Sequence, residues 1–272
     1  MINYTESNKS LWDGLTKINV KSDFYDVEGF RSGKSTLKPV ELSELGDVKG
    51  KSILHLQCHF GLDTLSLARM GANVTGVDLS SEAVTEAQKL SSELNIPAEF
   101  ICSDVYQLPE VLNKKYDIVF TSYGVLVWLN NLNKWADIVA HFLKPGGTFY
   151  IVEFHPFTNM FDESWQALTD SYFYNNQAIQ LTQQGSYADM SAEFEHVSYE
   201  WPHTISETIN ALRQAGLVID FFHEFPFSSY NCFPSLEEAG QDKFVIKDQA
   251  NAVPLMYSIK ASYMPELAMK HK

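Results

Sequence analysis

Cysteine is scarce in this chain, and no long hydrophobic run occurs. The three cysteines, Cys58, Cys102 and Cys232, stand far apart, and none belongs to a Cys-x-x-Cys pair. This spacing argues against a disulfide framework and against a zinc site, and it is typical of reduced thiols. No apolar run reaches membrane-spanning length, and the first residues lack the basic and apolar segments of a secretion signal. We therefore expect a cytoplasmic protein without a membrane anchor or a bound metal.

Positive charge is also in short supply. The sequence carries 20 lysines and arginines against 34 aspartates and glutamates, which gives a formal net charge of −14. Proteins that bind nucleic acids draw affinity from neutralising phosphates, so this balance argues against a nucleic-acid partner. It favours a small substrate that is neutral or cationic. At 272 residues, 45% of them hydrophobic, the chain can fold as one domain with an insertion or a lid, but not as two independent enzymes.

Glycine is missing from the loop where a dinucleotide-binding protein needs it most. Residues 51–78 have the pattern of a buried strand, a tight loop, a helix and a second strand, and the loop Gln57-Cys58-His59-Phe60-Gly61 has a single glycine. A pyrophosphate requires a G-x-G-x-x-G turn, because backbone amides approach phosphates closely only where no Cβ intervenes. The body of the chain also lacks a Tyr-x-x-x-Lys pair. These features disfavour an NAD-dependent oxidoreductase and favour a nucleoside ligand without phosphate.

Strand and helix patterns alternate through the rest of the chain. Strands are predicted at 53–56, 73–78, 98–102, 116–122, 148–154, 217–223 and 255–261. Helices are predicted at 63–70, after Ser80, around Trp135 until Lys144-Pro-Gly-Gly147, and from the capping box Thr204-x-x-Glu207 to Gly216. Alternation with short connections predicts an α/β fold with a doubly wound, mostly parallel sheet.

The pattern divides the chain into four parts. Residues 1–50 carry scattered aromatics with weak periodicity, so we expect short helices that form an N-terminal lid. Residues 51–155 are predicted to be the cofactor-binding core. In residues 156–200 aromatics and amides replace the strand and helix rhythm, which indicates an insertion that shapes the acceptor pocket. Residues 201–272 are expected to complete the same α/β domain.

The loop and the order of elements resemble the class I S-adenosylmethionine-dependent methyltransferases. In that family the loop after the first strand is usually Asp/Glu-x-Gly-x-Gly-x-Gly. On that pattern a histidine replaces the acid, Gln57 and His59 replace the first two glycines, and Gly61 is the third. The resemblance covers residues 51–154 and 201–262. It implies a seven-stranded sheet with a C-terminal antiparallel strand, and S-adenosylmethionine as the cofactor.

The resemblance also implies roles for residues at the carboxyl ends of the strands. Asp78 would accept both ribose hydroxyls, with a helix N-cap as the alternative, and we expect an exposed carboxylate that supports no core. Asp104 would take the adenine amine and the Val105 amide a ring nitrogen, unless Asp104 is an ordinary turn residue. Thr121, near the end of the fourth strand, would lie close to the methionine part and the reacting methyl group.

Other residues of the expected cofactor site come from the loop and its surroundings. Gln57 and His59 could hydrogen-bond the cofactor carboxylate, and Cys58 and Leu79 are expected as further neighbours of the cofactor. Arg31, in the N-terminal segment, is a candidate clamp for the same carboxylate, with a solvated arginine as the alternative.

A methyl acceptor that must lose a proton needs a base nearby. His155, after the fifth strand, is the first candidate, and His203, before the capped helix, is the second. Either histidine could instead shape a pocket or cap a turn. Six aromatic residues could line an apolar or cation-binding acceptor pocket or pack in the core: Tyr25, Trp128, Phe157, Trp165, Tyr172 and Trp201.

The function that these patterns favour is methyl transfer from S-adenosylmethionine to a small-molecule acceptor. A non-catalytic module that binds S-adenosylmethionine or its demethylated product is the alternative, because the loop is altered at Gln57 and His59. An NAD-dependent oxidoreductase is less favoured. The sequence leaves the acceptor, the methylated atom and the oligomeric state open.

Overall fold

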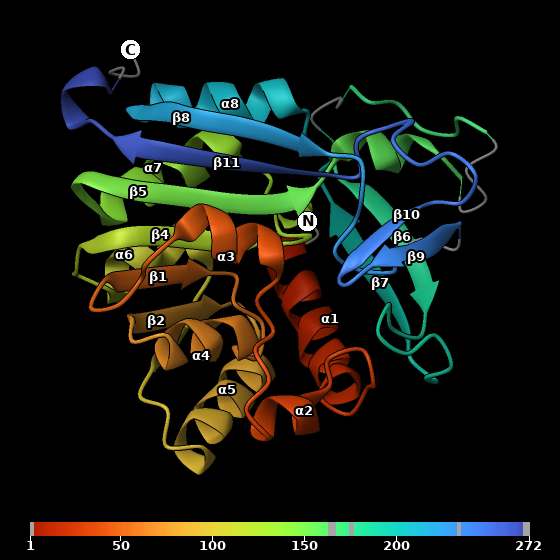
Figure 1. Ribbon diagram of the computed structural model, residues 1–272, viewed down its shortest axis with the longest axis horizontal. Helices are drawn as coiled ribbons and strands as arrows, with labels where there is room; N and C mark the ends of the chain where they lie inside the picture. Colours follow the sequence, from red (N-terminus) through yellow and green to blue (C-terminus); the bar gives the residue numbers. More distant parts are fainter. Residues whose placement is uncertain (1–2, 163–166, 174–176, 233–234, 269–272) are drawn as a thin grey trace.

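The computed structural model describes residues 3–162, 167–173, 177–232 and 235–268. Its centre is a seven-stranded sheet in the order β3-β2-β1-β4-β5-β11-β8 (Figure 1). The strands of this sheet are β1 (Ser52–Leu56), β2 (Asn73–Asp78), β3 (Glu99–Cys102), β4 (Tyr116–Ser122), β5 (Leu143–Phe154), β8 (Leu217–Phe225) and β11 (Met256–Tyr263). Only β11 runs antiparallel to its neighbours, β5 and β8. The predicted doubly wound, mostly parallel sheet with a C-terminal antiparallel strand is confirmed.

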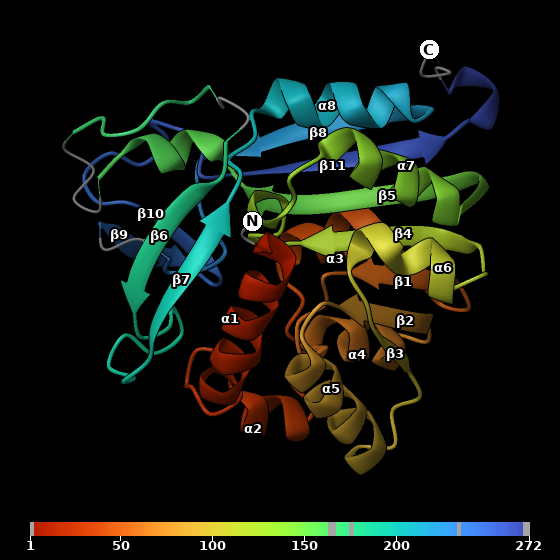
Figure 2. The same cartoon turned by 180° about the vertical axis from the view of Figure 1, so that it is seen from behind.

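Helices cover both faces of the sheet, as Figures 1 and 2 show from opposite sides. The α-helices are α1 (Tyr4–Asn19), α2 (Val27–Arg31), α3 (Pro39–Leu45), α4 (Leu62–Arg69), α5 (Ser81–Glu93), α6 (Leu108–Val111), α7 (Leu132–Phe142) and α8 (Ile205–Gln214). Short 3₁₀ helices are η1 (Val105–Gln107), η2 (Leu126–Trp128), η3 (Pro156–Met160) and η4 (Pro265–Leu267). Helices α3 and α4 lie on one face, and α6, α7 and α8 on the other. None of the helices in the described residues is long and apolar enough to cross a membrane.

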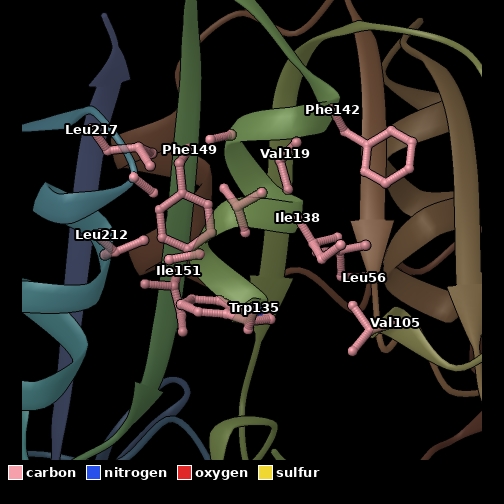
Figure 3. Close-up of a cluster of buried hydrophobic side chains, with 14 of the residues drawn as sticks. Leu56, Val105, Val119, Trp135, Ile138, Phe142, Phe149, Ile151, Leu212 and Leu217 are labelled. Carbon is pink, nitrogen blue, oxygen red and sulfur yellow. The ribbon is translucent and has the colours of Figure 1, made fainter. Parts of the chain in front are cut away.

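The core between the sheet and α7 holds the sheet in place. Trp135 of α7 is fully buried and packs edge-on against Phe149 of β5, with 5.5 Å between the ring centroids (Figure 3). Leu212 of α8 and Ile151 of β5 belong to the same cluster of buried side chains. Burial of each such side chain contributes roughly 1.5–3 kcal/mol, so this packing stabilises the sheet against α7 and α8.

Two pairs of short strands lie outside the main sheet. The hairpin of β6 (Ile179–Gln184) and β7 (Glu195–Glu200) belongs to the predicted insertion, and the hairpin of β9 (Leu236–Gly240) and β10 (Lys243–Ile246) connects β8 to β11. Both hairpins lie beyond the carboxyl ends of the parallel strands (Figures 1 and 2). The second hairpin was not predicted from the sequence.

Two element predictions need correction. The N-terminal segment was expected to form only short helices, but α1 has 16 residues, because Leu11 and Leu15 face inward and Asn3 caps its start. The segment Lys144-Pro-Gly-Gly147 was expected to precede the fifth strand, but β5 already begins at Leu143. Leu143 pairs with the start of β4 across an irregularity in the register, which places the two glycines within the strand.

Candidate active site

The loop after β1 keeps a glycine-type backbone without most of the glycines. Gln57, His59 and Gly61 all have positive φ angles, of 56°, 50° and 80°. Left-handed backbone costs a non-glycine residue roughly 1–2 kcal/mol, so this conformation must be held by surrounding contacts. Gly61 cannot be replaced without movement, because an added Cβ would lie 2.6 Å from a ring atom of Phe100. The three positions coincide with those predicted from the family pattern.

Asp78 holds this loop against the end of β2. Its Oδ2 accepts a hydrogen bond from the His59 N–H at 2.7 Å, and its Oδ1 accepts one from the Ser80 N–H at 2.9 Å. Burial raises the pKa of Asp78 to about 6, although these hydrogen bonds oppose the shift. The expectation of an exposed carboxylate that supports no core is therefore wrong: Asp78 is partly buried and fixes the loop.

Gln57 and Glu153 together hold the turn after β4. The Gln57 Nε2 donates a hydrogen bond to the Val125 carbonyl at 2.9 Å. The buried Glu153 carboxylate accepts hydrogen bonds from the backbone amides of Gly124, Val125, Leu126 and Phe154. The first and fourth strands thus end in loops that are bonded to each other at the edge where the methyl group was expected.

The remaining predicted cofactor neighbours lie along the same edge, and their polar groups have local partners. Asp104 accepts the Tyr106 N–H at 2.9 Å and so caps η1, while the Val105 side chain is buried in the core (Figure 3). The Thr121 hydroxyl donates to the Leu56 carbonyl at 3.1 Å and is fully buried.

Cys58 and Leu79 also lie close to the loop. The Cys58 N–H donates to the Val77 carbonyl at 2.9 Å, which continues the pairing of β1 with β2, and the Leu79 carbonyl accepts from the Cys102 thiol at 3.5 Å. Burial, with the nearby Asp78 charge, raises the pKa of Cys58 well above that of a free thiol. Cys58 therefore packs as a neutral side chain beneath the loop.

Arg31 does not point toward the loop. Its guanidinium pairs with Glu93 of α5 at 2.6 Å and with Glu28 of its own helix at 3.3 Å. In this arrangement the charge is used to attach α2 to α5, and a role as a clamp for a carboxylate would require these pairs to break.

The two histidines predicted as bases both have structural partners. His155 Nδ1 accepts the Phe157 N–H at 3.1 Å, and its Nε2 lies 3.1 Å from a Glu224 carboxylate oxygen. His203 Nε2 lies 2.6 Å from the Leu129 carbonyl. Burial lowers the pKa of both rings. The geometry fits a neutral His155 with its proton on Nε2, and a base role for either residue stays a prediction.

An aromatic cap covers the loop. It consists of Trp12, Phe24, Tyr25, His59, Tyr187 and Tyr230, whose neighbouring ring centroids lie 5.1–6.4 Å apart. Trp12 lies in α1, and Phe24 and Tyr25 lie between α1 and α2. His59 belongs to the loop itself, Tyr187 lies between β6 and β7, and Tyr230 lies between β8 and β9. The hydroxyls of Tyr25 and Tyr187 are hydrogen-bonded to each other.

Two buried side-chain atoms of the loop have no hydrogen-bond partner among the described residues. They are Gln57 Oε1 and His59 Nε2. Burial lowers the pKa of His59 to about 3, so its ring is neutral. An unpaired buried polar atom costs roughly 1–3 kcal/mol, and such atoms in a loop with glycine-type backbone are suited to a polar ligand.

The N-terminal segment lies across the edge of the sheet. Asp13 of α1 accepts hydrogen bonds from the Ser80 hydroxyl at 2.7 Å and the Glu82 N–H at 3.1 Å, beside Asp78. Asn8 exchanges two hydrogen bonds with the backbone of Tyr199 in β7. Helix α1 therefore joins the edge of the sheet to the insertion.

The predicted pocket aromatics separate into different places. Tyr25 belongs to the cap, and Trp128 packs against Trp12 with 5.2 Å between ring centroids. The Tyr172 hydroxyl accepts the Ile205 N–H, which places that ring at the start of α8. Trp201 is buried and Phe157 packs against Phe161, whereas Trp165 lies outside the described residues.

Two carboxyl groups, the buried Glu41 and the partly buried Asp63, were missed in the sequence analysis. Glu41 of α3 accepts a hydrogen bond from the Tyr123 hydroxyl at 2.8 Å. Asp63 of α4 accepts one from the hydroxyl of the neighbouring Ser122 at 3.4 Å. Burial, together with the Asp63 charge, raises the pKa of Glu41 to about 8. Asp63 follows Gly61 by two residues, which was an available signal, but Glu41 lies in a segment without a sequence pattern.

Comparison with known proteins agrees with this geometry. Residues 53–147 match the family model described as a methyltransferase domain. A ubiquinone biosynthesis O-methyltransferase from Photorhabdus laumondii is 30% identical over 132 residues, which cover 47% of this chain and 55% of the relative. Its counterpart from Proteus mirabilis is 29% identical over 133 residues, covering 47% and 54%. The chain thus spans about half the length of these curated relatives.

Solved structures resemble the chain over more of its length. A putative S-adenosylmethionine-dependent methyltransferase from Listeria monocytogenes has a TM-score of 0.59 at 20% identity, covering 83% of this chain and 96% of its own. An S-adenosylmethionine-dependent methyltransferase from Clostridium acetobutylicum has a TM-score of 0.56 at 17% identity, covering 96% of this chain and 100% of its own. At these identities the similarity establishes the fold.

Proposed function

We propose that the chain transfers a methyl group from S-adenosylmethionine to a small-molecule acceptor, because residues 53–147 match the model of a methyltransferase domain and the sheet has the class I strand order. The observation that carries the proposal is the loop from Gln57 to Gly61, whose backbone has left-handed residues at the three expected positions. The sulfonium of S-adenosylmethionine supplies an electrophilic methyl group, so the protein has mainly to position the acceptor and exclude water.

The residues around the loop fit the chemistry of this cofactor. We assign the ribose hydroxyls to Asp78, whose carboxylate already accepts two backbone amides and has lone pairs left for further donors. The Gln57 Oε1 is an unpaired acceptor suited to the cofactor ammonium, and the His59 Nε2 is suited to its carboxylate when it carries the proton. Asp104 and Val105 are assigned to the adenine and Thr121 to the region of the methyl group.

The surrounding segments are assigned to acceptor binding. We propose that residues 1–50 act as a lid and that residues 156–200 shape the acceptor pocket, because α1 joins the edge of the sheet to β7. Three free thiols, Cys58, Cys102 and Cys232, support a place in the reducing cytoplasm. The negative charge of the chain supports an acceptor other than a nucleic acid.

Two measurements test the proposal. S-adenosylhomocysteine should raise the melting temperature, because a ligand at about a hundred times its dissociation constant adds roughly 2.7 kcal/mol to the native state. NADH should not do so, and a larger shift with NADH would overturn the assignment of the loop. Labelled methyl groups should pass from S-adenosylmethionine into a metabolite extract. Binding without any turnover would instead support a non-catalytic module.

A further inference from the structure

Two carboxyl groups accept hydrogen bonds from the residues at the end of β4, outside the residues assigned to the cofactor. The donors are the hydroxyls of two consecutive residues. The Ser122 hydroxyl donates to Asp63 at 3.4 Å, and the Tyr123 hydroxyl donates to Glu41 at 2.8 Å. Glu41 is fully buried, and Asp63 also accepts the Thr36 hydroxyl at 2.5 Å. Burial, and then the Asp63 charge, raises the pKa of Glu41. Together they form an acidic site beside the expected methyl group.

Aromatic rings stand beside this acidic site. The Tyr230 ring lies 4.9 Å from the Tyr123 ring and 6.4 Å from the Phe154 ring, between centroids. Burial and then the charges of Asp63, Glu41 and Asp242 raise the pKa of Tyr230, so all of these carboxyl groups act on the same ring. A tyrosine ring on which several carboxyl charges act is a favourable place for an organic cation.

The chain itself places an ammonium group on this ring. Lys38 Nζ lies 4.8 Å from the Tyr230 ring centroid and is paired with Asp242 of the β9–β10 turn at 2.7 Å. The Lys38 charge also lowers the pKa of Asp63, against the larger effect of burial. An alkylammonium ion thus already occupies one side of this environment, which identifies the kind of group that it accommodates.

The Ser229 hydroxyl, beside Tyr123, is a buried polar group without a hydrogen-bond partner among the described residues. Ser229 is 2% exposed, and its Oγ has no partner within hydrogen-bond geometry in the part of the chain that the structure describes. Burial raises the pKa of Tyr123, and the nearby Ser229 hydroxyl opposes this shift, so the two side chains are neighbours. A small polar ligand between Tyr123 and Tyr230 would supply the missing partner.

From these observations we propose that Glu41, Asp63, Tyr123 and Tyr230 form the acceptor subsite and that the acceptor is a primary or secondary amine. The inference rests on the proposed function. Above the Glu41 pKa of about 8, where Glu41 is ionised, the amine enters as its ammonium ion, pairs with the two carboxyl groups and lies against the Tyr230 ring. One N–H proton passes to the Glu41 carboxylate. The freed nitrogen lone pair then forms the N–CH₃ bond, while the electrons of the S–CH₃ bond stay on sulfur and leave a neutral thioether.

The test compares molecules of equal shape and different charge. With S-adenosylhomocysteine at saturation, butylamine and benzylamine should each raise the melting temperature in a saturable manner. Butanol, benzyl alcohol, butyrate and benzoate should not. In calorimetry at about pH 9, where Glu41 is ionised, Glu41→Gln should weaken amine binding about tenfold or more, while the melting-temperature shift caused by S-adenosylhomocysteine alone is retained. Glu266→Gln, a change at an exposed glutamate in η4, is the matched control and should leave amine binding unchanged.

The outcomes separate this inference from the proposed function. If S-adenosylhomocysteine itself causes no shift, the proposed function fails. If it does but the amines do not bind, or the alcohols bind equally well, the amine subsite is wrong. Should Glu41→Gln not fold, Asp63→Asn and Tyr123→Phe provide the same comparison. Amine binding that is unchanged in both of these variants would also overturn the assignment.

Discussion

The Asp78 carboxylate accepts the backbone N–H of His59 at 2.7 Å and so ties the end of β2 to the loop after β1. His59 occupies the position where the family pattern has a glycine, and its φ angle is 50°. The hydrogen bond helps to hold a histidine in a backbone conformation that it would otherwise avoid. The residue assigned to the ribose therefore also maintains the shape of the loop.

Asp78→Asn should weaken S-adenosylhomocysteine about tenfold to a hundredfold in calorimetry, because hydrogen bonds to a charged group contribute roughly 1.5–3 kcal/mol each and the amide oxygen compensates in part. It should also lower the free energy of unfolding by about 1–2 kcal/mol, since asparagine has one acceptor oxygen where Asp78 uses two. A nucleoside without the 2′ and 3′ hydroxyls is the control. If the variant loses the same affinity for that analogue, Asp78 does not hold the ribose.

Gln57 allows a test of the backbone and the side chain separately. Gln57→Ala removes the hydrogen bond to the Val125 carbonyl and keeps a Cβ at a φ angle of 56°. Gln57→Gly removes the same bond but relieves the left-handed strain. Urea denaturation should therefore find the alanine variant less stable than the glycine variant by about 1 kcal/mol. Equal stability of the two variants would show that this position is not strained.

Glu41 should make the protein less stable as the pH rises. Its pKa is about 8 in the native state against 4.5 for an ordinary glutamate, so between these values the native state holds more protons than the unfolded chain. The free energy of unfolding then falls with rising pH, with a slope of at most about 1.4 kcal/mol per pH unit. Denaturation of Glu41→Gln across this range should give a flatter profile. An unchanged slope would mean that Glu41 ionises normally.

His155→Ala tests the predicted base against the structural role seen here. If His155 is the base, methyl transfer should slow while the affinity for S-adenosylhomocysteine stays nearly unchanged. If its bonds to Phe157 and Glu224 are its whole role, the variant should lose about 1–2 kcal/mol of stability and keep its turnover per folded molecule. Loss of cofactor binding together with activity would contradict both placements. Undiminished turnover would mean that His203 is the base, or that the acceptor loses its proton without a histidine.

Local patterns were sufficient for the framework of the main sheet. The predicted boundaries of β2 and β4 are those of the structure, and Thr204 with Glu207 forms the predicted capping box. Short connections with alternating strands and helices leave few topologies, so the doubly wound sheet followed from sequence alone. The acid at the end of β2 and the glycine at Gly61 were found because each follows a strand with a clear pattern.

The sequence by itself determined the fold, the loop and the residues at the ends of the strands, because those depend on neighbours a few positions apart. Only the tertiary structure decided what surrounds them. Asn8 and Tyr199, which are 191 positions apart, bond to each other, and Lys38 meets Asp242 across 204 positions. No local period encodes such contacts, since they form only when the packed sheet brings distant segments to one edge. The acceptor subsite proposed here is built from contacts of this kind, and the histidines that stood out in the sequence found partners elsewhere.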